Sequence, residues 1–423
     1  MLTKVERDEI IALIRQEVTP AIGCTEPIAV ALAVARVKEL LTVIPEKLDI
    51  WLSANVLKNA MGVGIPGTGM SGLPIAIAMG ALVGKSEYGL EVLRDSTPDI
   101  VEEGKKLVDR GIIKIHLKED IVEKLYIEVT ASAGPDTARV IISREHTRFS
   151  LIEKNGIKLL ELEDNETTET VTEQLQLSFD KVCDFAFYTP IDEIRFIKKT
   201  VELNKAAAEE SLKGTYGHSV AQTLTNSTMG NSVYNHMLSV TAAACDARMA
   251  GAMIPVMSNS GSGNQGIAAT LPVSVFAEET GKSEEELIRA LILSHLITIY
   301  IKQSLGRLSG LCGAVVAATG SGCGVTYLMG GTREQIGFTV KNMIGNVTGM
   351  ICDGAKPSCT LKVHNGVSTA TLSALLAMDN KVVTAVEGIV DEDVDKTIQN
   401  LTKIGREGMT ETDKMVLDIM TNK

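Results

Sequence analysis

The sequence predicts an α+β fold, in which a mostly helical domain carries an inserted small α/β domain with a largely antiparallel sheet. Two observations predict this. Between residues 45 and 164 many apolar residues fall in short β-branched segments bounded by turn residues, which is typical of strands. From residue 165 onwards apolar residues recur at helical spacing in long runs rich in Ala and Met. We therefore assign residues 1–44 and 165–423 to the helical domain and residues 45–164 to the insertion.

The N-terminal part of the chain predicts two helices before the insertion begins. Residues 5–18 have apolar positions at helical spacing, and Pro20 ends that helix. A second helix begins at Thr25-Glu26-Pro27, where a capping residue, an acid and a proline share the first turn, and continues to about Leu41.

The remaining elements follow from the same two periodicities. We expect strands over residues 48–54, 112–117, 124–131, 138–143 and 147–153, and a short helix over 73–82. After an acidic stretch at 161–173, we expect helices over residues 170–185, 191–212, 219–253, 265–279, 284–304, 333–352 and 368–378. These helices are apolar on nearly every face, which is typical of helices buried inside a domain.

Charge and composition limit the class of partner. The chain of 423 residues has 41 Lys and Arg against 53 Asp and Glu, a net charge of −12, which argues against nucleic acid or an anionic membrane surface as the partner. No segment has the roughly 18–20 apolar residues of a membrane span, and the first residues do not resemble a signal peptide. We expect a cytoplasmic protein that acts on a small molecule.

Three cysteines lie in two Gly-containing turns that follow buried helical segments. Cys352 and Cys359 stand seven residues apart in ICDGAKPSC, and Cys312 lies upstream in GRLSGLCG. Seven cysteines in a large cytoplasmic chain do not indicate a disulfide framework, so clustered ones are candidates for metal binding or catalysis. Thiolates held from such loops suit an iron–sulfur cluster. The alternative is that these residues are small members of the core.

A fourth cysteine, Cys24, stands directly before the helix that begins at Thr25. The helix dipole at that position favours a thiolate, which is suited to act as a nucleophile or a base. A structural thiol beside a helix cap is the alternative.

Two loops rich in Gly, Ser and Asn are candidates for binding a carboxylate through backbone amides and side-chain donors. In SNSGSGNQG the candidate residues are Ser258, Asn259, Ser260 and Asn264, and in IPGTGMSG the candidate is Thr68. The first loop matches GxGxxG, but its helical surroundings argue against a dinucleotide site. Loops that merely need glycine conformations remain the alternative. The six histidines show no zinc-ligand spacing.

Five motifs together resemble the L-cysteine desulfidase family, which is related to the α chains of the iron–sulfur L-serine dehydratases. They are PAIGCTEP, IPGTGMSG, SNSGSGNQG, GRLSGLCGA and ICDGAKPSC, and the resemblance spans about residues 5 to 420. It implies that Cys312, Cys352 and Cys359 hold a [4Fe–4S] cluster with one iron open to substrate, and that Cys24 is the base. The implied reaction converts L-cysteine to pyruvate, ammonia and hydrogen sulfide.

Three points stay open at this stage. The same site would suit L-serine, making the protein a dehydratase, and an exposed cluster would also suit a non-enzymatic amino-acid or redox sensor. Because an iron open to substrate is open to oxygen, we expect aerobically prepared protein to lack the cluster. The buried, Met-rich helices lead us to expect a homodimer.

Overall fold

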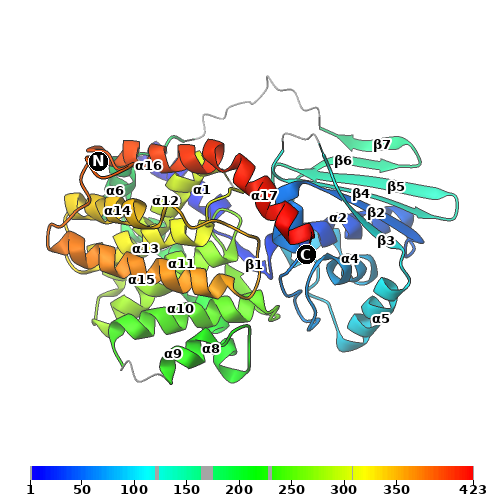
Figure 1. The fold of residues 1–423 in the computed structure, drawn as a ribbon, viewed down its shortest axis with the longest axis horizontal. Coiled ribbons are helices and arrows are strands. Elements are labelled where there is room, and N and C mark those ends of the chain that lie inside the picture. The colour runs from blue at the N-terminus through cyan, green and yellow to red at the C-terminus, as the bar shows by residue number, and fades with distance from the viewer. Residues whose placement is uncertain (1, 120–122, 163–174, 227–230, 307, 423) are drawn as a thin grey trace.

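The computed structural model describes residues 2–119, 123–162, 175–226, 231–306 and 308–422. A helical half lies beside a half built on a six-stranded sheet, so the predicted α+β class is confirmed (Figure 1). The C-terminal helix α17 (Thr410–Thr421) lies between the two halves. Among the described residues, no helix has the combination of length and hydrophobicity that crossing a bilayer requires.

The sheet is largely antiparallel, as predicted. Its strand order is β3-β2-β4-β5-β6-β7, and only the β2–β3 pair is parallel within the described residues. The bounds are β2 Lys47–Leu52, β3 Ile113–Leu117, β4 Tyr126–Ala133, β5 Asp136–Ser143, β6 Phe149–Lys154 and β7 Ile157–Glu161. The edge strand β7 was not expected, because its apolar residues are largely exposed and it lies beside the acidic stretch.

Helix α2 (Thr25–Leu41) has the predicted bounds and packs on the sheet, and α4 (Leu73–Leu82) packs on α2. Its buried apolar residues share one core with β2, β4 and β5. We predicted that this helix belongs to the helical domain, and that division stays a prediction. In the structure, α2 packs on the sheet, and its N-terminus lies in the helical half.

A small second sheet holds that N-terminus in place. Strand β1 (Pro20–Ile22) pairs antiparallel with β8 (Pro255–Met257), which precedes α11 (Gly263–Glu279). The start of α2 and the start of α11 are thereby brought close together, although they are more than 200 residues apart in the sequence.

The helical half is built around α10 (Val233–Met249), α11, α12 (Glu284–Leu305), α13 (Gly313–Leu328) and α15 (Cys359–Met378). Helix α13 was not predicted, because three glycines in a short stretch indicate a loop. The structure shows that they allow close packing: a Cβ at Gly320 would lie 2.2 Å from the carbonyl oxygen of Ser294 on α12. Without side chains at such positions, the α12 and α13 backbones approach directly.

Several predicted helix ends differ in the structure. The run 219–253 is two helices, α9 (Val220–Thr225) and α10, while the run 333–352 ends early, as α14 (Arg333–Val347). Helix α15 begins at Cys359 rather than at residue 368, and part of the predicted 170–185 helix lies outside the described residues. The remaining elements are α1 Lys4–Glu17, α3 Ala54–Ala60, α5 Pro98–Asp109, α6 Phe179–Tyr188, α7 Ile191–Ile194, α8 Lys199–Lys213 and α16 Val394–Lys403, with short 3₁₀ or π turns at Ser86–Glu91, Arg195–Lys198 and Ile404–Gly408.

Candidate functional site

Four helices begin at one cavity of about 100 Å³, and the four cysteines singled out in the sequence all line it. Cys24 caps α2, Cys312 caps α13, Cys359 is the first residue of α15, and Cys352 lies in the loop before α15. Helix α11 completes the wall with its first turn. Helix N-termini carry partial positive charge and unpaired N–H groups, so their convergence favours anionic groups in this cavity.

The two cysteine loops are held side by side by backbone hydrogen bonds. Leu311 and Ile351 form an antiparallel bridge. The amide of Cys312 donates to the carbonyl of Met350 at 2.9 Å, and the amide of Cys352 donates to the carbonyl of Gly310 at 2.8 Å. This pairing brings Cys312 and Cys352 to one cavity from loops forty residues apart.

Lysine side chains order the turn from Cys352 to Cys359. Lys356 and Lys362 both pair with the Asp353 carboxylate. Burial acts to raise the pKa of Asp353, but these two ammonium groups outweigh it and lower the pKa to about 2. The Cys359 thiol donates to the carbonyl of Gly354 at 3.5 Å. The turn is therefore a defined structure rather than an extended linker.

The three thiols fit the donor set of an iron–sulfur cluster. Burial raises the pKa of Cys312 to about 12, with the neighbouring Cys352 adding to the effect, and burial also raises the pKa of Cys359. Among the described residues, no three His, Cys, Asp or Glu side chains are arranged around a single metal ion. The ligands of a cluster bind different irons and stand farther apart than the ligands of one ion, so three cysteines around a shared cavity suit a cluster.

Cys24 differs from its predicted state. It caps α2 as expected, but it is buried, and its thiol donates to the Glu26 Oε2 atom at 3.2 Å. Burial and the charge of Glu26 raise the pKa of Cys24 well above its ordinary value, with only a partial opposing effect from Arg248. The helix dipole is thus outweighed, and Cys24 is a neutral thiol hydrogen-bonded to a carboxylate.

Glu26 is a site residue that we did not predict. Its carboxylate accepts hydrogen bonds from Cys24, from Thr25 Oγ1 at 3.0 Å and from Asn59 Nδ2 at 3.1 Å, and the His146 ring lies 4.0 Å away. Burial acts to raise the pKa of Glu26, but His146 and the hydrogen bonds lower it overall. In the sequence analysis we interpreted Glu26 only as an acid that favours the first turn of its helix. Its position two residues after Cys24 could have indicated that it belongs to the site.

Arg248, at the end of α10, is the second site residue that we did not predict. Its side chain is 2% exposed, lines the cavity, and donates to Asn264 Oδ1 at 2.9 Å. A Cβ at Gly263 would lie 2.2 Å from the Arg248 Nε atom, so glycine there leaves room for the guanidinium. The available signal was an arginine that, with Asp246, interrupts the apolar residues of the run AAACDARMA.

Of the five predicted substrate-binding residues, Asn264 alone lines the small cavity. The hydroxyl of Ser258 donates to the Thr19 carbonyl at 2.6 Å, and that of Thr68 donates to the Ile65 carbonyl at 2.8 Å. The amide of Asn259 donates to the His295 ring at 3.0 Å, and the Ser260 hydroxyl donates to the Asn259 side chain. These hydrogen bonds order the loops themselves.

The GxGxxG match serves packing. Strand β8 precedes it, but that strand belongs to a two-stranded antiparallel sheet rather than to a parallel βαβ unit. A Cβ at Gly266 would lie 1.8 Å from the Met257 carbonyl oxygen. The glycine therefore lets α11 approach β8, and the dinucleotide alternative finds no support in the fold.

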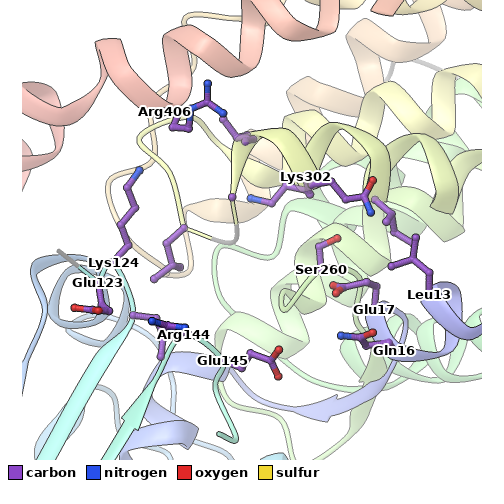
Figure 2. Close-up of a pocket in the computed structure, with 16 residues that line it drawn as sticks. Leu13, Gln16, Glu17, Glu123, Lys124, Arg144, Glu145, Ser260, Lys302 and Arg406 are labelled. Atoms are coloured by element: carbon purple, nitrogen blue, oxygen red, sulfur yellow. The ribbon is translucent and has the colours of Figure 1, made fainter. Parts of the chain in front are cut away.

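A second cavity of about 500 Å³ lies beside the first, and Lys302 and Leu308 line both. Figure 2 shows side chains entering the larger cavity from the two halves of the molecule: Lys124 and Arg144 from the sheet side, and Lys302 and Ser260 from the helical side. The small cavity therefore lies next to a wider polar space between the halves.

Comparisons with known proteins identify the family of this chain. The family model described as "Serine dehydratase alpha chain" matches residues 87–418. A UPF0597 protein of Bacteroides fragilis is 66% identical over 426 residues, covering all of both chains, and one of Porphyromonas gingivalis is 55% identical over 99% of each chain. A UPF0597 protein of Oleidesulfovibrio alaskensis is 45% identical over the whole of both chains. The chain belongs to the serine dehydratase alpha chain family.

Proposed function

We propose that this protein is an iron–sulfur-dependent lyase that eliminates sulfide from L-cysteine to give pyruvate, ammonia and hydrogen sulfide. Membership of the serine dehydratase alpha chain family supports a lyase-type function. One observation carries the proposal: Cys24 and the three cysteines Cys312, Cys352 and Cys359 line a single cavity.

Cys312, Cys352 and Cys359 would hold a [4Fe–4S] cluster. Such a cluster, with three protein ligands, supplies a Lewis acid through the iron that has none. The protein's own contribution is a set of helix N-termini together with Lys356 and Lys362, which place positive charge around the thiols.

Cys24 and Glu26 act as one proton-accepting unit in this proposal. The hydrogen bond from the Cys24 thiol to Glu26 allows the thiol proton to move to the carboxylate as the Cys24 sulfur takes the α-proton of the substrate. The unit then carries one proton more, with Cys24 as a thiol and Glu26 as a carboxylic acid. Asn59 and Thr25 hold the carboxylate in position throughout.

The elimination breaks the Cα–H and Cβ–S bonds of the substrate and forms one double bond. The electron pair of the α-C–H bond forms the Cα–Cβ double bond, and the Cβ–S bond breaks with its pair leaving on sulfur. The enamine product tautomerises to an imine, and water hydrolyses the imine to pyruvate and ammonia. The overall reaction consumes one water and needs no oxidant or reductant.

A second candidate is the dehydration of L-serine at the same site. The description of the matching family model favours it. The two reactions share every step except the leaving group, which is hydroxide instead of sulfide.

The test is an anaerobic reconstitution followed by assay with each amino acid separately. Iron and acid-labile sulfide are measured first, and then pyruvate and released sulfide are followed over time. Equal release of pyruvate and sulfide from L-cysteine supports the desulfidase. Pyruvate from L-serine alone moves the function to dehydratase. Binding of either amino acid without pyruvate contradicts both and supports a sensor, and absence of a cluster contradicts the mechanism.

A further inference from the structure

Three buried polar atoms, on residues that line the small cavity, have no hydrogen-bond partner among the described residues. They are Nε of Arg248, Oδ1 of Asn59 and Oε1 of Gln265. All three residues line the cavity, and their exposed fractions are 2%, 8% and 4%. Buried polar groups in native proteins are almost always paired, so unpaired ones around a cavity indicate a bound ligand or water.

The unpaired donor, Nε of Arg248, belongs to a guanidinium that has no acidic partner among the described residues. Arg248 donates to the neutral side chain of Asn264, and no carboxylate of the described residues forms an ion pair with it. A buried guanidinium without an acidic partner is unfavourable on its own and suits a carboxylate, which it can bind through two N–H groups.

The other two atoms are acceptors, and one of them is fixed by its neighbours. The amide nitrogen of Asn59 donates to Glu26 Oε1, so its oxygen is the atom left for a ligand. Gln265 stands on the first turn of α11, the same turn whose Gly263 lies against the Arg248 side chain. Amide oxygens beside the Glu26 carboxylate are suited to an ammonium group.

We propose that Arg248 binds the carboxylate, and Asn59 and Gln265 the ammonium, of a small zwitterionic α-amino acid. This inference rests on the proposed function and deepens it, because it assigns the recognition of the two groups that L-cysteine and L-serine share. The cavity of about 100 Å³ exceeds the roughly 10–15 Å³ that one water needs, so it admits a ligand larger than a water molecule.

The same arrangement places the α-carbon beside the proposed base. Arg248, Asn59 and Cys24 line the same cavity, and Asn59 holds the carboxylate that accepts the Cys24 proton. An amino acid bound through both groups therefore lies in the cavity that also holds the proposed base. Specificity for the zwitterion and orientation for proton removal come from one set of contacts.

The test measures binding of compounds that have no leaving group, by calorimetry on the anaerobically reconstituted protein. L-alanine has both recognised groups, ethylamine lacks the carboxylate and propionate lacks the ammonium. We expect L-alanine to bind about tenfold or more tightly than either analogue, since a hydrogen bond to a charged group contributes roughly that factor. Equal affinity for all three compounds would overturn the inference.

Substitutions test which residue binds the carboxylate and which binds the ammonium group. Arg248→Gln should weaken L-alanine by about tenfold or more and leave ethylamine unchanged, with Arg248→Lys in between. Gly263→Ala, which places a methyl group against the guanidinium, should reproduce the loss with Arg248 still present. Asn59→Leu should weaken ethylamine instead. Arg289→Gln, at an arginine paired elsewhere with Glu285, is the matched control and should bind L-alanine as the unmodified protein does.

The outcomes separate this inference from the proposed function. Arg248-dependent L-alanine binding without pyruvate formation supports the inference and contradicts the lyase. Pyruvate formation with an unchanged L-alanine affinity and KM in Arg248→Gln supports the lyase and overturns the inference. Iron content is measured on every variant, and a loss of L-alanine binding that merely follows a loss of iron also overturns it. If Arg248→Gln does not fold, the inference is tested by the L-alanine affinity of Gly263→Ala and by the affinities of the unmodified protein for the three compounds.

Discussion

The buried Lys58 ammonium and the partly exposed Asp413 carboxylate form an ion pair, with 2.6 Å between Nζ and Oδ1. Lys58 lies on α3 in the sheet half, and Asp413 lies on the C-terminal helix α17. The same ammonium donates to the Cys352 carbonyl at 3.1 Å. The last helix of the chain is therefore connected, through one lysine, to the loop that carries a proposed cluster ligand.

Lys58→Met should strongly destabilise the protein, because it leaves Asp413 without its partner in a site where Lys58 is 1% exposed. Breaking a fully buried pair in this way costs about 3–5 kcal/mol, and the partial exposure of Asp413 makes that an upper limit here. Denaturant unfolding of the cluster-free protein measures this loss. The reconstituted variant should also lose iron faster than the unmodified protein under a chelator. Lys414→Met, at an exposed neighbouring pair with Glu411, is the control and should change stability by about 1 kcal/mol or less.

Replacing any one of Cys312, Cys352 and Cys359 by Ala should abolish both cluster and turnover, because each is proposed to ligate a different iron. The measurement is iron and acid-labile sulfide per chain after anaerobic reconstitution, followed by pyruvate formation. Cys183→Ala is the control, since Cys183 is a buried cysteine that belongs to a different core cluster. A variant of one of the three that keeps a full cluster would remove that residue from the ligand set.

Cys24→Ala should keep the cluster and lose about 10²–10⁴-fold in kcat, the usual contribution of a general base. Loss of iron in this variant would instead make Cys24 a ligand. Glu26→Gln tests the proton acceptor, because removing the carboxylate charge lowers the pKa of Cys24. Alkylation of Cys24, followed by peptide mass spectrometry over a range of pH, should therefore reach half of its maximal rate at a lower pH in Glu26→Gln. An unchanged or higher midpoint would contradict the coupling.

The fold should lose stability in mild acid through His295. This ring is fully buried and accepts a hydrogen bond from Asn259, and burial lowers its pKa to about 3. Between about pH 6.5, the ordinary pKa of histidine, and about pH 3, the unfolded chain binds a proton at His295 that the folded protein does not. Stability is then complete above about pH 6.5 and falls with decreasing pH by about 1.4 kcal/mol per unit.

His295→Gln should flatten that dependence. Urea unfolding at several pH values between 4 and 7 measures the slope for both proteins, and the variant should lack up to the one-proton contribution. Identical slopes would show that other groups cause the acid sensitivity.

Local sequence determined the elements whose ends carry their own signals. The capping residue, acid and proline at Thr25-Glu26-Pro27 predicted the start of α2, and its bounds are as observed. The short β-branched segments predicted five of the six strands in the large sheet. Helix α13 was missed because its glycines serve contacts with α12, a neighbour that local periodicity does not reveal. The first turns of α15 were also missed, because the contacts around the Cys352 loop are not visible in the local sequence.

For the site, the residue pattern indicated which cysteines to consider, and the motifs around them indicated a family. Tertiary structure alone brought Cys24, Cys312, Cys352 and Cys359 to one cavity and added Glu26, Arg248 and Asn59. It also reversed the predicted ionisation of Cys24, because burial and a neighbouring carboxylate outweigh a helix dipole. The physical reason is one of range: capping and periodicity act within a few residues, whereas burial and the pairing of polar groups depend on elements that are distant in the chain.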